Sequence, residues 1–135
     1  DILGVDAAIL FSDILVVPEA MGMELHFSEG KGPQFPTPLR DEAALKALRP
    51  VESNQDLGFV MEAIRNIRQN LADRVPLIGF AGAPWTLATY MVEGGSSDEF
   101  ERIKLLFHTD RATFDALLEK LTALPNCHAI ESLQA

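Results

Sequence analysis

Two mainly apolar runs, with an amphipathic segment between them, constrain this sequence most; Asp6 is the one charged residue in either run. The first run covers residues 5–11 and closes on Ser12 and Asp13; the second covers residues 75–81 and closes on Gly82. An apolar run without polar alternation is typical of a strand that is buried on both faces, as in a parallel sheet. We therefore expect strands at 5–11 and 75–81 in an α/β fold.

Helical patterns lie between the two runs. Apolar residues recur at near-helical spacing in 57–71, which predicts an amphipathic helix of about four turns. Asn54 or Asp56 is expected to cap its start. A shorter helix is expected at 41–48. Residues 28–38 hold two Gly and three Pro, so irregular backbone is predicted there.

The second half of the sequence is predicted to be mainly helical. Pro84 suits the first turn of a helix that continues through Tyr90. A break is predicted at 93–97, and Ser96 with Glu99 has the spacing of a capping box. The last helix is expected to start at Thr109 or Asp110 and to turn its apolar residues inward.

Composition limits the function classes. The chain has 135 residues, of which 47% are hydrophobic and 23% charged, which is typical of one globular domain. Its net charge of −9 disfavours nucleic acid and anionic membranes as partners. No apolar run approaches the roughly 20 residues that cross a bilayer. The single Cys127 cannot form an internal disulfide, so a reducing, cytoplasmic compartment is expected.

Asp13 is the first candidate for a functional role. Carboxyl ends of parallel strands carry the chemistry of α/β folds, and Asp13 follows the first predicted strand. One interpretation is that Asp13 starts a turn or caps the next helix. The other is a carboxylate beside apolar walls, provided by Phe11 and by 14–17, which accepts N–H groups of a ligand or balances a developing positive charge.

Tyr90 is the second candidate, and its two interpretations are a half-buried helix aromatic and a phenol donor to a substrate carboxylate. Trp85 is expected to serve packing. Gly79 and Gly82 indicate tight backbone near a strand end, without a phosphate-loop pattern. Zinc needs three or four ligands at compatible spacing, which the three His and Cys127 do not supply, so no metal site is expected.

Two long stretches go further than pattern alone. FSDILVVPEAMGM, followed by GKGPQFPTPLR, and LIGFAGAPWTLATYMVEGG resemble the uroporphyrinogen decarboxylase family of haem biosynthesis. The resemblance covers residues 1–122. Residues 123–135 form a divergent tail in which we find no match, so we divide the chain there.

The resemblance implies a fold, an activity and roles for residues. The fold would be part of a (β/α)₈ TIM barrel, an incomplete arc of parallel strands with surrounding helices. The activity would be decarboxylation of the four acetates of uroporphyrinogen III to give coproporphyrinogen III, without metal or organic cofactor. Asp13 matches the family's Asp that accepts pyrrole N–H groups, and Tyr90 its Tyr near a reacting acetate. Phe80 and Gly82 fall in the segment that lines the cleft.

The resemblance also implies that this chain is a portion of the enzyme. A whole barrel needs about 250 residues, and the family's Arg-rich motif would precede Asp1. A chain of net charge −9 does not hold a substrate with eight carboxylates by itself. We therefore expect the isolated chain to be inactive and unstable. The resemblance also implies a homodimer, which is the usual state of the family. The alternative is a non-catalytic porphyrinogen-binding or interaction protein of the same family.

Overall fold

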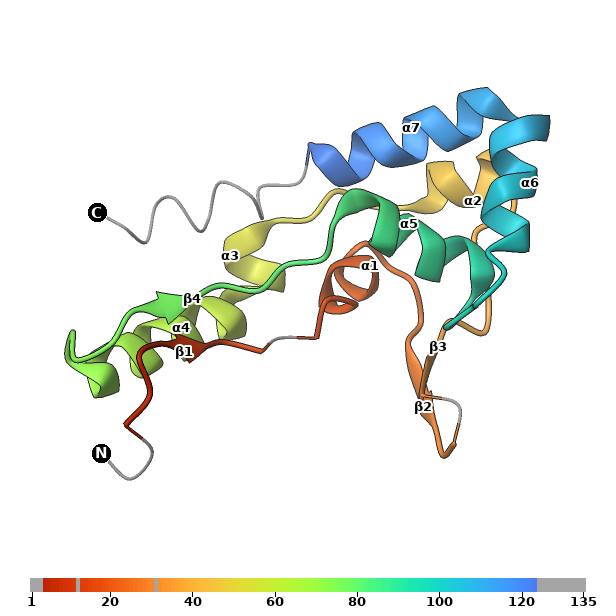
Figure 1. Ribbon diagram of the computed structural model, residues 1–135. Helices are drawn as coiled ribbons and strands as arrows, with labels where there is room; N and C mark the ends of the chain where they lie inside the picture. The colour runs from red at the N-terminus through yellow and green to blue at the C-terminus, as the bar shows by residue number, and fades with distance from the viewer. Residues whose placement is uncertain (1–3, 12, 31, 124–135) are drawn as a thin grey trace.

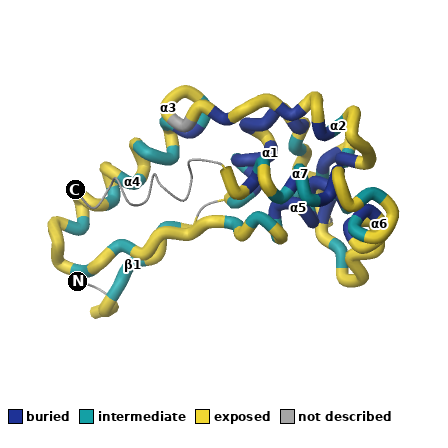
Figure 2. Tube along the Cα trace, turned by 90° about the horizontal axis from the view of Figure 1, so that it is seen from above, coloured by how far each residue is buried: buried dark blue, intermediate teal, exposed yellow. Residues whose placement is uncertain are grey.

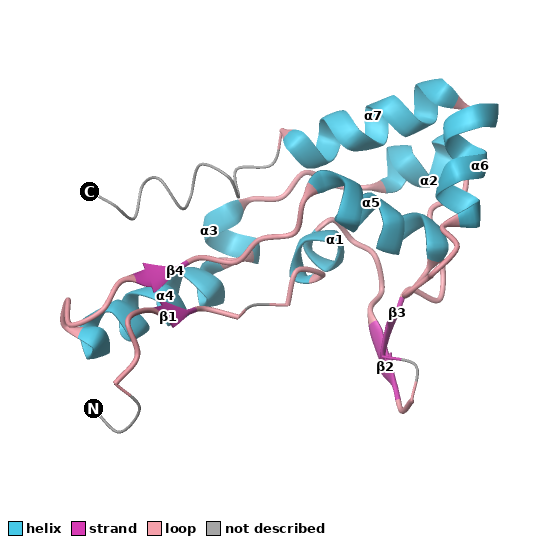
Figure 3. Ribbon diagram, in the orientation of Figure 1, coloured by secondary structure: helices cyan, strands magenta, loops and turns pink. Residues whose placement is uncertain are grey.

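The chain contains both strands and helices, as expected of an α/β protein. The computed structural model describes residues 4–11, 13–30 and 32–123, so the predicted division after residue 122 falls at the edge of this part and the tail lies outside it. The elements, shown in Figures 1 and 3, are β1 (Ala8–Ile9), α1 (Val16–Ala20), β2 (His26–Ser28), β3 (Gly32–Gln34), α2 (Glu42–Ala47), α3 (Ser53–Asp56), α4 (Gly58–Leu71), β4 (Leu77–Ile78), α5 (Pro84–Glu93), α6 (Glu101–Thr109) and α7 (Arg111–Thr122).

The two predicted strands pair with one another in parallel. Ala8 lies opposite Leu77 and Ile9 opposite Ile78. The amide of Leu10 continues the ladder by donating to the carbonyl of Ile78 at 3.0 Å. The α/β class and the parallel pairing are thus confirmed, although β1 and β4 are shorter than the runs 5–11 and 75–81.

The predicted burial of these strands on both faces is wrong for this chain. Exposed fractions on one face of the pair are 66% for Ile9, 81% for Phe11, 47% for Ile78 and 45% for Phe80. The opposite face carries partly buried residues such as Leu77, and α4 lies beside the pair in Figure 1. A strand with helices on one face only, and no further strand beside it, leaves its other face in water.

The core lies at the other end of the molecule, among the helices (Figure 2). Helix α5 packs against α6 and α7, and α2 packs against α7. The largest side chains that are almost fully buried are Leu15, Met21, Leu39, Met91, Ile103 and Leu117. Every residue of α4, by contrast, keeps some exposure. The helical end therefore contains the hydrophobic burial that stabilises the chain.

A β-hairpin over residues 26–34 overlaps the stretch 28–38, and sequence patterns did not predict it. β2 and β3 pair antiparallel, with Phe27 opposite Pro33, and they project away from the helices in Figure 1. Gly30 and Gly32 have φ of +76° and +72°, which glycine adopts without strain. Pro33 is compatible with a strand because it lies in a two-stranded edge, so the Gly and Pro content did not exclude strands here.

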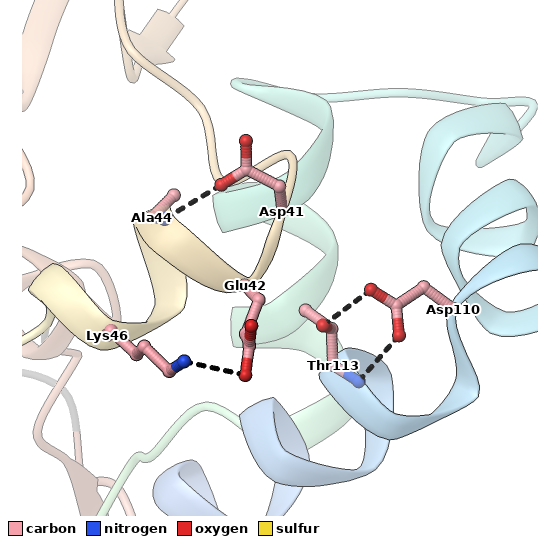
Figure 4. Close-up of polar contacts among 6 residues, drawn as sticks. All are labelled: Asp41, Glu42, Ala44, Lys46, Asp110 and Thr113. Carbon is pink, nitrogen blue, oxygen red and sulfur yellow. Dashed lines mark hydrogen bonds and ion pairs between the residues drawn. The ribbon is translucent and has the colours of Figure 1, made fainter.

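Two helices have aspartate caps at their predicted starts, and two predicted caps are wrong. Asp41 caps α2 by accepting the N–H of Ala44 at 2.8 Å, and Asp110 caps α7 by accepting the N–H of Thr113 at 3.1 Å (Figure 4). Helix α4 starts after Leu57 without a side-chain cap, because Asp56 instead accepts the guanidinium of Arg49 and the N–H of Glu52.

The second wrong cap is the predicted box of Ser96 and Glu99. Helix α6 starts only at Glu101, and Ser97, not Ser96, accepts a backbone N–H, that of Phe100, at 3.0 Å. The side chain that caps α6 comes from the preceding helix. Glu93 of α5 accepts the N–H of Arg102 and of Ile103, an interaction between two elements that local spacing does not encode.

The exposed apolar face of β1 and β4 should make the isolated chain self-associate. Phe11 and Phe80 lie side by side on this face, and paired apolar rings in water favour association. We expect sedimentation velocity to show concentration-dependent oligomers, and the double variant Phe11→Ser/Phe80→Ser to shift them toward monomer. Phe27→Ser, which removes an equally exposed Phe from the hairpin, is the control. A chain that stays monomeric at all concentrations would contradict this prediction.

Acid should destabilise the chain through two carboxylates that accept hydrogen bonds in the folded state. The hydroxyl and N–H of Thr113 lower the pKa of Asp110, and the guanidinium of Arg49 lowers the pKa of Asp56. A carboxyl with a lower pKa in the folded state stabilises the fold above its unfolded pKa of about 3.9. That contribution is lost as the pH falls through the folded pKa.

Thermal unfolding between neutral pH and pH 3 measures this loss. Asp110→Asn keeps a good capping acceptor but cannot titrate, so its melting temperature should fall less on acidification than that of the unsubstituted chain. Equal falls in both proteins would show that Asp110 does not contribute to the acid dependence.

Candidate active site

The candidate site lies where β1 and β4 end. Phe11 follows β1 by two residues and Phe80 follows β4 by two residues, so the register of the pair places them opposite one another. Their ring centroids are 5.2 Å apart with an interplanar angle of 33°. Two aromatic faces thus stand at the carboxyl ends of parallel strands, which is the edge where α/β folds bind ligands.

Gly82 holds the two loops that leave this edge close together. A Cβ at Gly82 would lie 2.8 Å from Cδ2 of Leu87 and 3.1 Å from Cβ of Ile14. Ile14 comes from the loop after β1, and Leu87 from α5. The lack of a side chain at position 82 is therefore required for the loop after β4 to pack against the residue that follows Asp13.

Asp13 is fixed in a turn at the same edge. Its Oδ1 accepts the N–H of Leu15 at 2.9 Å, so the first interpretation of Asp13, as a turn former before a helix, is what the structure shows. Within the part of the chain that the structure describes, no other donor contacts this carboxylate. The bond sets the direction of the side chain and leaves Oδ2 available to a ligand N–H.

The apolar walls predicted around Asp13 are only partly present. Phe11 is exposed at the site, whereas Leu15 and Val17 are buried in the helical core. Ile14 and Val16 are half-buried and pack against that core. Asp13 itself is exposed. The residues after Asp13 therefore anchor α1, and the aromatic wall comes from Phe11 and Phe80 instead.

Tyr90 lies in a separate pocket of about 320 Å³. Helix α5 contributes Trp85, Thr86, Thr89 and Tyr90 to its lining, and the following loop contributes Gly95, Ser96, Ser97 and Phe100. Tyr90 is half-buried, while Trp85 is 46% exposed, so Trp85 lines the pocket in addition to packing against Phe114 at a centroid distance of 6.1 Å. Hydroxyl groups and aromatic faces dominate this lining.

The structure thus brings three of the four predicted site residues to one edge. Asp13, Phe80 and Gly82 lie at the ends of β1 and β4, together with Phe11, which we had named only as a wall. Tyr90 follows Gly82 by two helical turns, and Asp13 is not among the residues that line its pocket. The signal for Phe11 was its place two residues before Asp13, at the end of the first apolar run.

Metal ligands do not gather at either place. Across residues 4–11, 13–30 and 32–123, no group of three His, Cys, Asp or Glu side chains lies close enough to hold a metal ion. The chemistry that this arrangement offers is that of a fixed carboxylate beside aromatic faces. Such a group accepts N–H donors and stabilises a nearby cation.

The fold and site define an α/β protein with a carboxylate-and-aromatic site at the carboxyl ends of parallel strands. Comparison with protein families narrows this class, because the model of the uroporphyrinogen decarboxylase (URO-D) family matches residues 1–135. The chain belongs to the uroporphyrinogen decarboxylase family. The match includes the last residues, for which we found no resemblance, so the division after residue 122 stays a prediction.

Curated relatives agree with this membership. The chain is 53% identical over 134 residues to the uroporphyrinogen decarboxylase of Thioalkalivibrio sulfidiphilus. This match covers 96% of the chain and 38% of the relative. It is 50% identical over 130 residues to that of Legionella pneumophila strain Lens, with 96% and 37% covered. It is 56% identical over 116 residues to that of Hahella chejuensis, with 86% and 33% covered. The chain thus spans little more than a third of the length of these relatives.

Proposed function

We propose that this chain is a portion of a uroporphyrinogen decarboxylase and forms one arc of its (β/α)₈ barrel. Family membership supports the assignment, and the paired strands β1 and β4 with α4 beside them are the kind of unit from which such a barrel is built. The single observation that carries the site is the carboxylate of Asp13, held at the barrel edge by the N–H of Leu15.

The proposed reaction removes CO₂ from the four acetate groups of uroporphyrinogen III. A proton adds to the ring carbon next to the one that bears the acetate, which gives a cationic ring whose positive charge is shared with the acetate-bearing carbon. The bond between the acetate methylene and its carboxylate then breaks, and the electron pair flows into the ring as CO₂ leaves. Protonation of the methylene and loss of the ring proton give a methyl pyrrole. Loss of CO₂ is slow unless a group in the site stabilises the cationic ring.

Asp13 is proposed to provide that stabilisation. Its free Oδ2 accepts pyrrole N–H groups, and its negative charge lowers the energy of the ring cation. Phe11 and Phe80, whose ring centroids lie 5.2 Å apart at the ends of the same strands, suit the flat, apolar pyrrole rings. Closure of the barrel over these rings would exclude water and strengthen the interaction with the carboxylate.

Tyr90, Phe80 and Gly82 complete the proposal. The hydroxyl of Tyr90 orients one substrate carboxylate, Phe80 lines the cleft, and Gly82 keeps the loop beside Asp13 close-packed. No organic cofactor or metal takes part. The remaining carboxylates of the substrate require basic residues from the rest of the barrel, because the chain carries a net charge of −9. The family homodimer and a cytoplasmic location are part of this proposal. Separately, none of the helices in the described part of the chain has the length and apolar character needed to span a membrane.

A chimaera tests the proposal directly. Residues 1–135 replace the matching segment of the Thioalkalivibrio sulfidiphilus relative, which supplies the rest of the barrel, and formation of coproporphyrinogen is measured. We expect turnover by the chimaera and none by the isolated chain. Turnover by the isolated chain would overturn the assignment as a portion. Porphyrinogen binding by a folded chimaera without any product would favour a non-catalytic binding protein.

A further inference from the structure

We infer that Glu93 is a positioning residue that ties the end of α5 to the start of α6 and thereby holds the loop 94–100 against Tyr90. The loop forms one wall of the pocket that contains Tyr90. The structural part of this inference stands on the contacts of Glu93 alone. Its consequence for turnover rests on the proposed function.

The carboxylate of Glu93 replaces a local cap. Its Oε1 accepts the N–H of Arg102 at 2.9 Å and the N–H of Ile103 at 3.0 Å. These are the second and third residues of α6, whose N–H groups have no partner within the helix. Phe100, at the cap position, provides no side-chain acceptor. A negative charge also complements the positive end of the helix dipole.

Water is a poor substitute for Glu93 at this point. The side chain of Ile103 is fully buried in the core between the helices, with an exposed fraction of 0%. Removing the carboxylate would leave the partly buried N–H of Ile103 beside the core without a partner, which costs more than an ordinary surface hydrogen bond, whereas the exposed N–H of Arg102 could still reach water. The start of α6 would then shift or fray to reach water.

The loop is held at both of its ends by groups around Glu93. At the first end, Gly94 donates its N–H to the carbonyl of Tyr90 at 2.9 Å. At the second end, Ser97 accepts the N–H of Phe100, and Glu93 holds the residues that follow. Glu93 lies one helical turn after Tyr90. If α6 moved away from Glu93, the loop 94–100 would move with it, and the pocket that this loop lines together with Tyr90 would widen.

The charges around Glu93 favour a carboxylate at this position. Arg40 donates from Nη1 to the carbonyl of Val92. Burial lowers the pKa of Arg40, the nearby Arg102 lowers it further, and Glu93 raises it. Glu93 thus offsets the repulsion between Arg40 and Arg102 at the junction of α5 and α6. A neutral or basic side chain at position 93 would not offset this repulsion.

The tether is tested by amide hydrogen exchange in the 135-residue chain. Peptides that cover 101–103 report the capped amides, and peptides that cover 111–114 report the independent cap of α7. We expect Glu93→Ala to speed exchange at 101–103 at least roughly tenfold, with little change at 111–114. Glu93→Gln keeps an acceptor oxygen and should retain most of the protection. Glu62→Ala, which removes one exposed carboxylate from α4, is the matched control.

The effect on the pocket is tested by a double-mutant cycle in the chimaera. Glu93→Ala should lower kcat roughly 10- to 100-fold through misplacement of the wall opposite Tyr90. If Glu93 acts through this pocket, adding Tyr90→Phe should lower kcat little further, whereas a merely structural role gives losses that multiply. Glu93→Gln should recover most of the activity.

The two proposals fail in distinguishable ways. Without decarboxylase activity in the chimaera, the proposed function fails, while exchange at 101–103 and acrylamide quenching of Trp85, the single tryptophan of the chain, still decide the tether. More efficient quenching of Trp85 fluorescence in Glu93→Ala than in Glu62→Ala would support the tether. Unchanged exchange at 101–103 in Glu93→Ala, or kcat losses that multiply with those of Tyr90→Phe, would overturn the inference.

Discussion

Replacing Asp13 by asparagine in the chimaera should lower kcat roughly 10²- to 10³-fold, the size of effect seen when a preorganised electrostatic group is removed. Asparagine retains a side-chain oxygen that accepts the N–H of Leu15, as Oδ1 does now at 2.9 Å. The turn before α1 should therefore survive, and the variant should fold. What disappears is the negative charge that balances the cationic pyrrole ring.

Asp41→Asn is the matched control for this prediction. Asp41 is also an exposed aspartate whose Oδ1 accepts a backbone N–H, that of Ala44, at 2.8 Å (Figure 4). It lies at the start of α2, among the helices, and plays no part in the proposed site. Steady-state coproporphyrinogen formation should be slowed by Asp13→Asn and unchanged by Asp41→Asn. Similar kcat values for both variants would refute the electrostatic role of Asp13.

Replacing Gly94 by alanine should destabilise the helical end by about 2–6 kcal/mol. Gly94 ends α5 with φ of +88°, a conformation that costs other residues about 1–3 kcal/mol. A Cβ there would also lie 2.8 Å from Cγ of Pro38 and 3.2 Å from the carbonyl oxygen of Phe35, and overpacking adds about 1–3 kcal/mol. Phe35 cannot move away easily, because its N–H donates to the carbonyl of Gly94 at 2.8 Å.

Gly30→Ala separates the two costs. Gly30 also has a positive φ, of +76°, but a Cβ there would meet no atom within 4 Å. Only the conformational cost of about 1–3 kcal/mol should remain, and it should fall on the hairpin. Urea unfolding followed by the helical circular-dichroism signal gives the free energy of unfolding of each variant. Equal values for Gly94→Ala and Gly30→Ala would show that contact with Pro38 and Phe35 contributes nothing.

Local patterns predicted the elements whose signals are local. The spacing of apolar residues in 57–71 correctly predicted α4, and Pro84 correctly marked the start of α5. Asp41 and Asp110, which lie at predicted helix starts, act as caps by accepting N–H groups three residues further on. The position of Asp13 after an apolar run likewise placed it at the end of a strand.

Contacts between neighbouring elements explain the errors. Glu93 caps α6 from another helix, so no capping box was readable near Ser96. Asp56 was unavailable to α4 because Arg49 and Glu52 bind it. The hairpin at β2 and β3 depends on pairing across a turn, which the abundance of Gly and Pro seemed to exclude. In each case the deciding partner is specified by packing and not by spacing.

The sequence by itself therefore determined the α/β class, the parallel strand pair, the main helices and the aspartate at the strand end. Apolar periodicity and capping chemistry act over a few residues and are readable along the chain. Only the tertiary structure decided that Phe11 and Phe80 stack at the site, that Gly82 packs the neighbouring loop against Ile14, and that Tyr90 faces a pocket walled by the loop that Glu93 holds. These relations join segments far apart in the chain, and packing in three dimensions is what selects them.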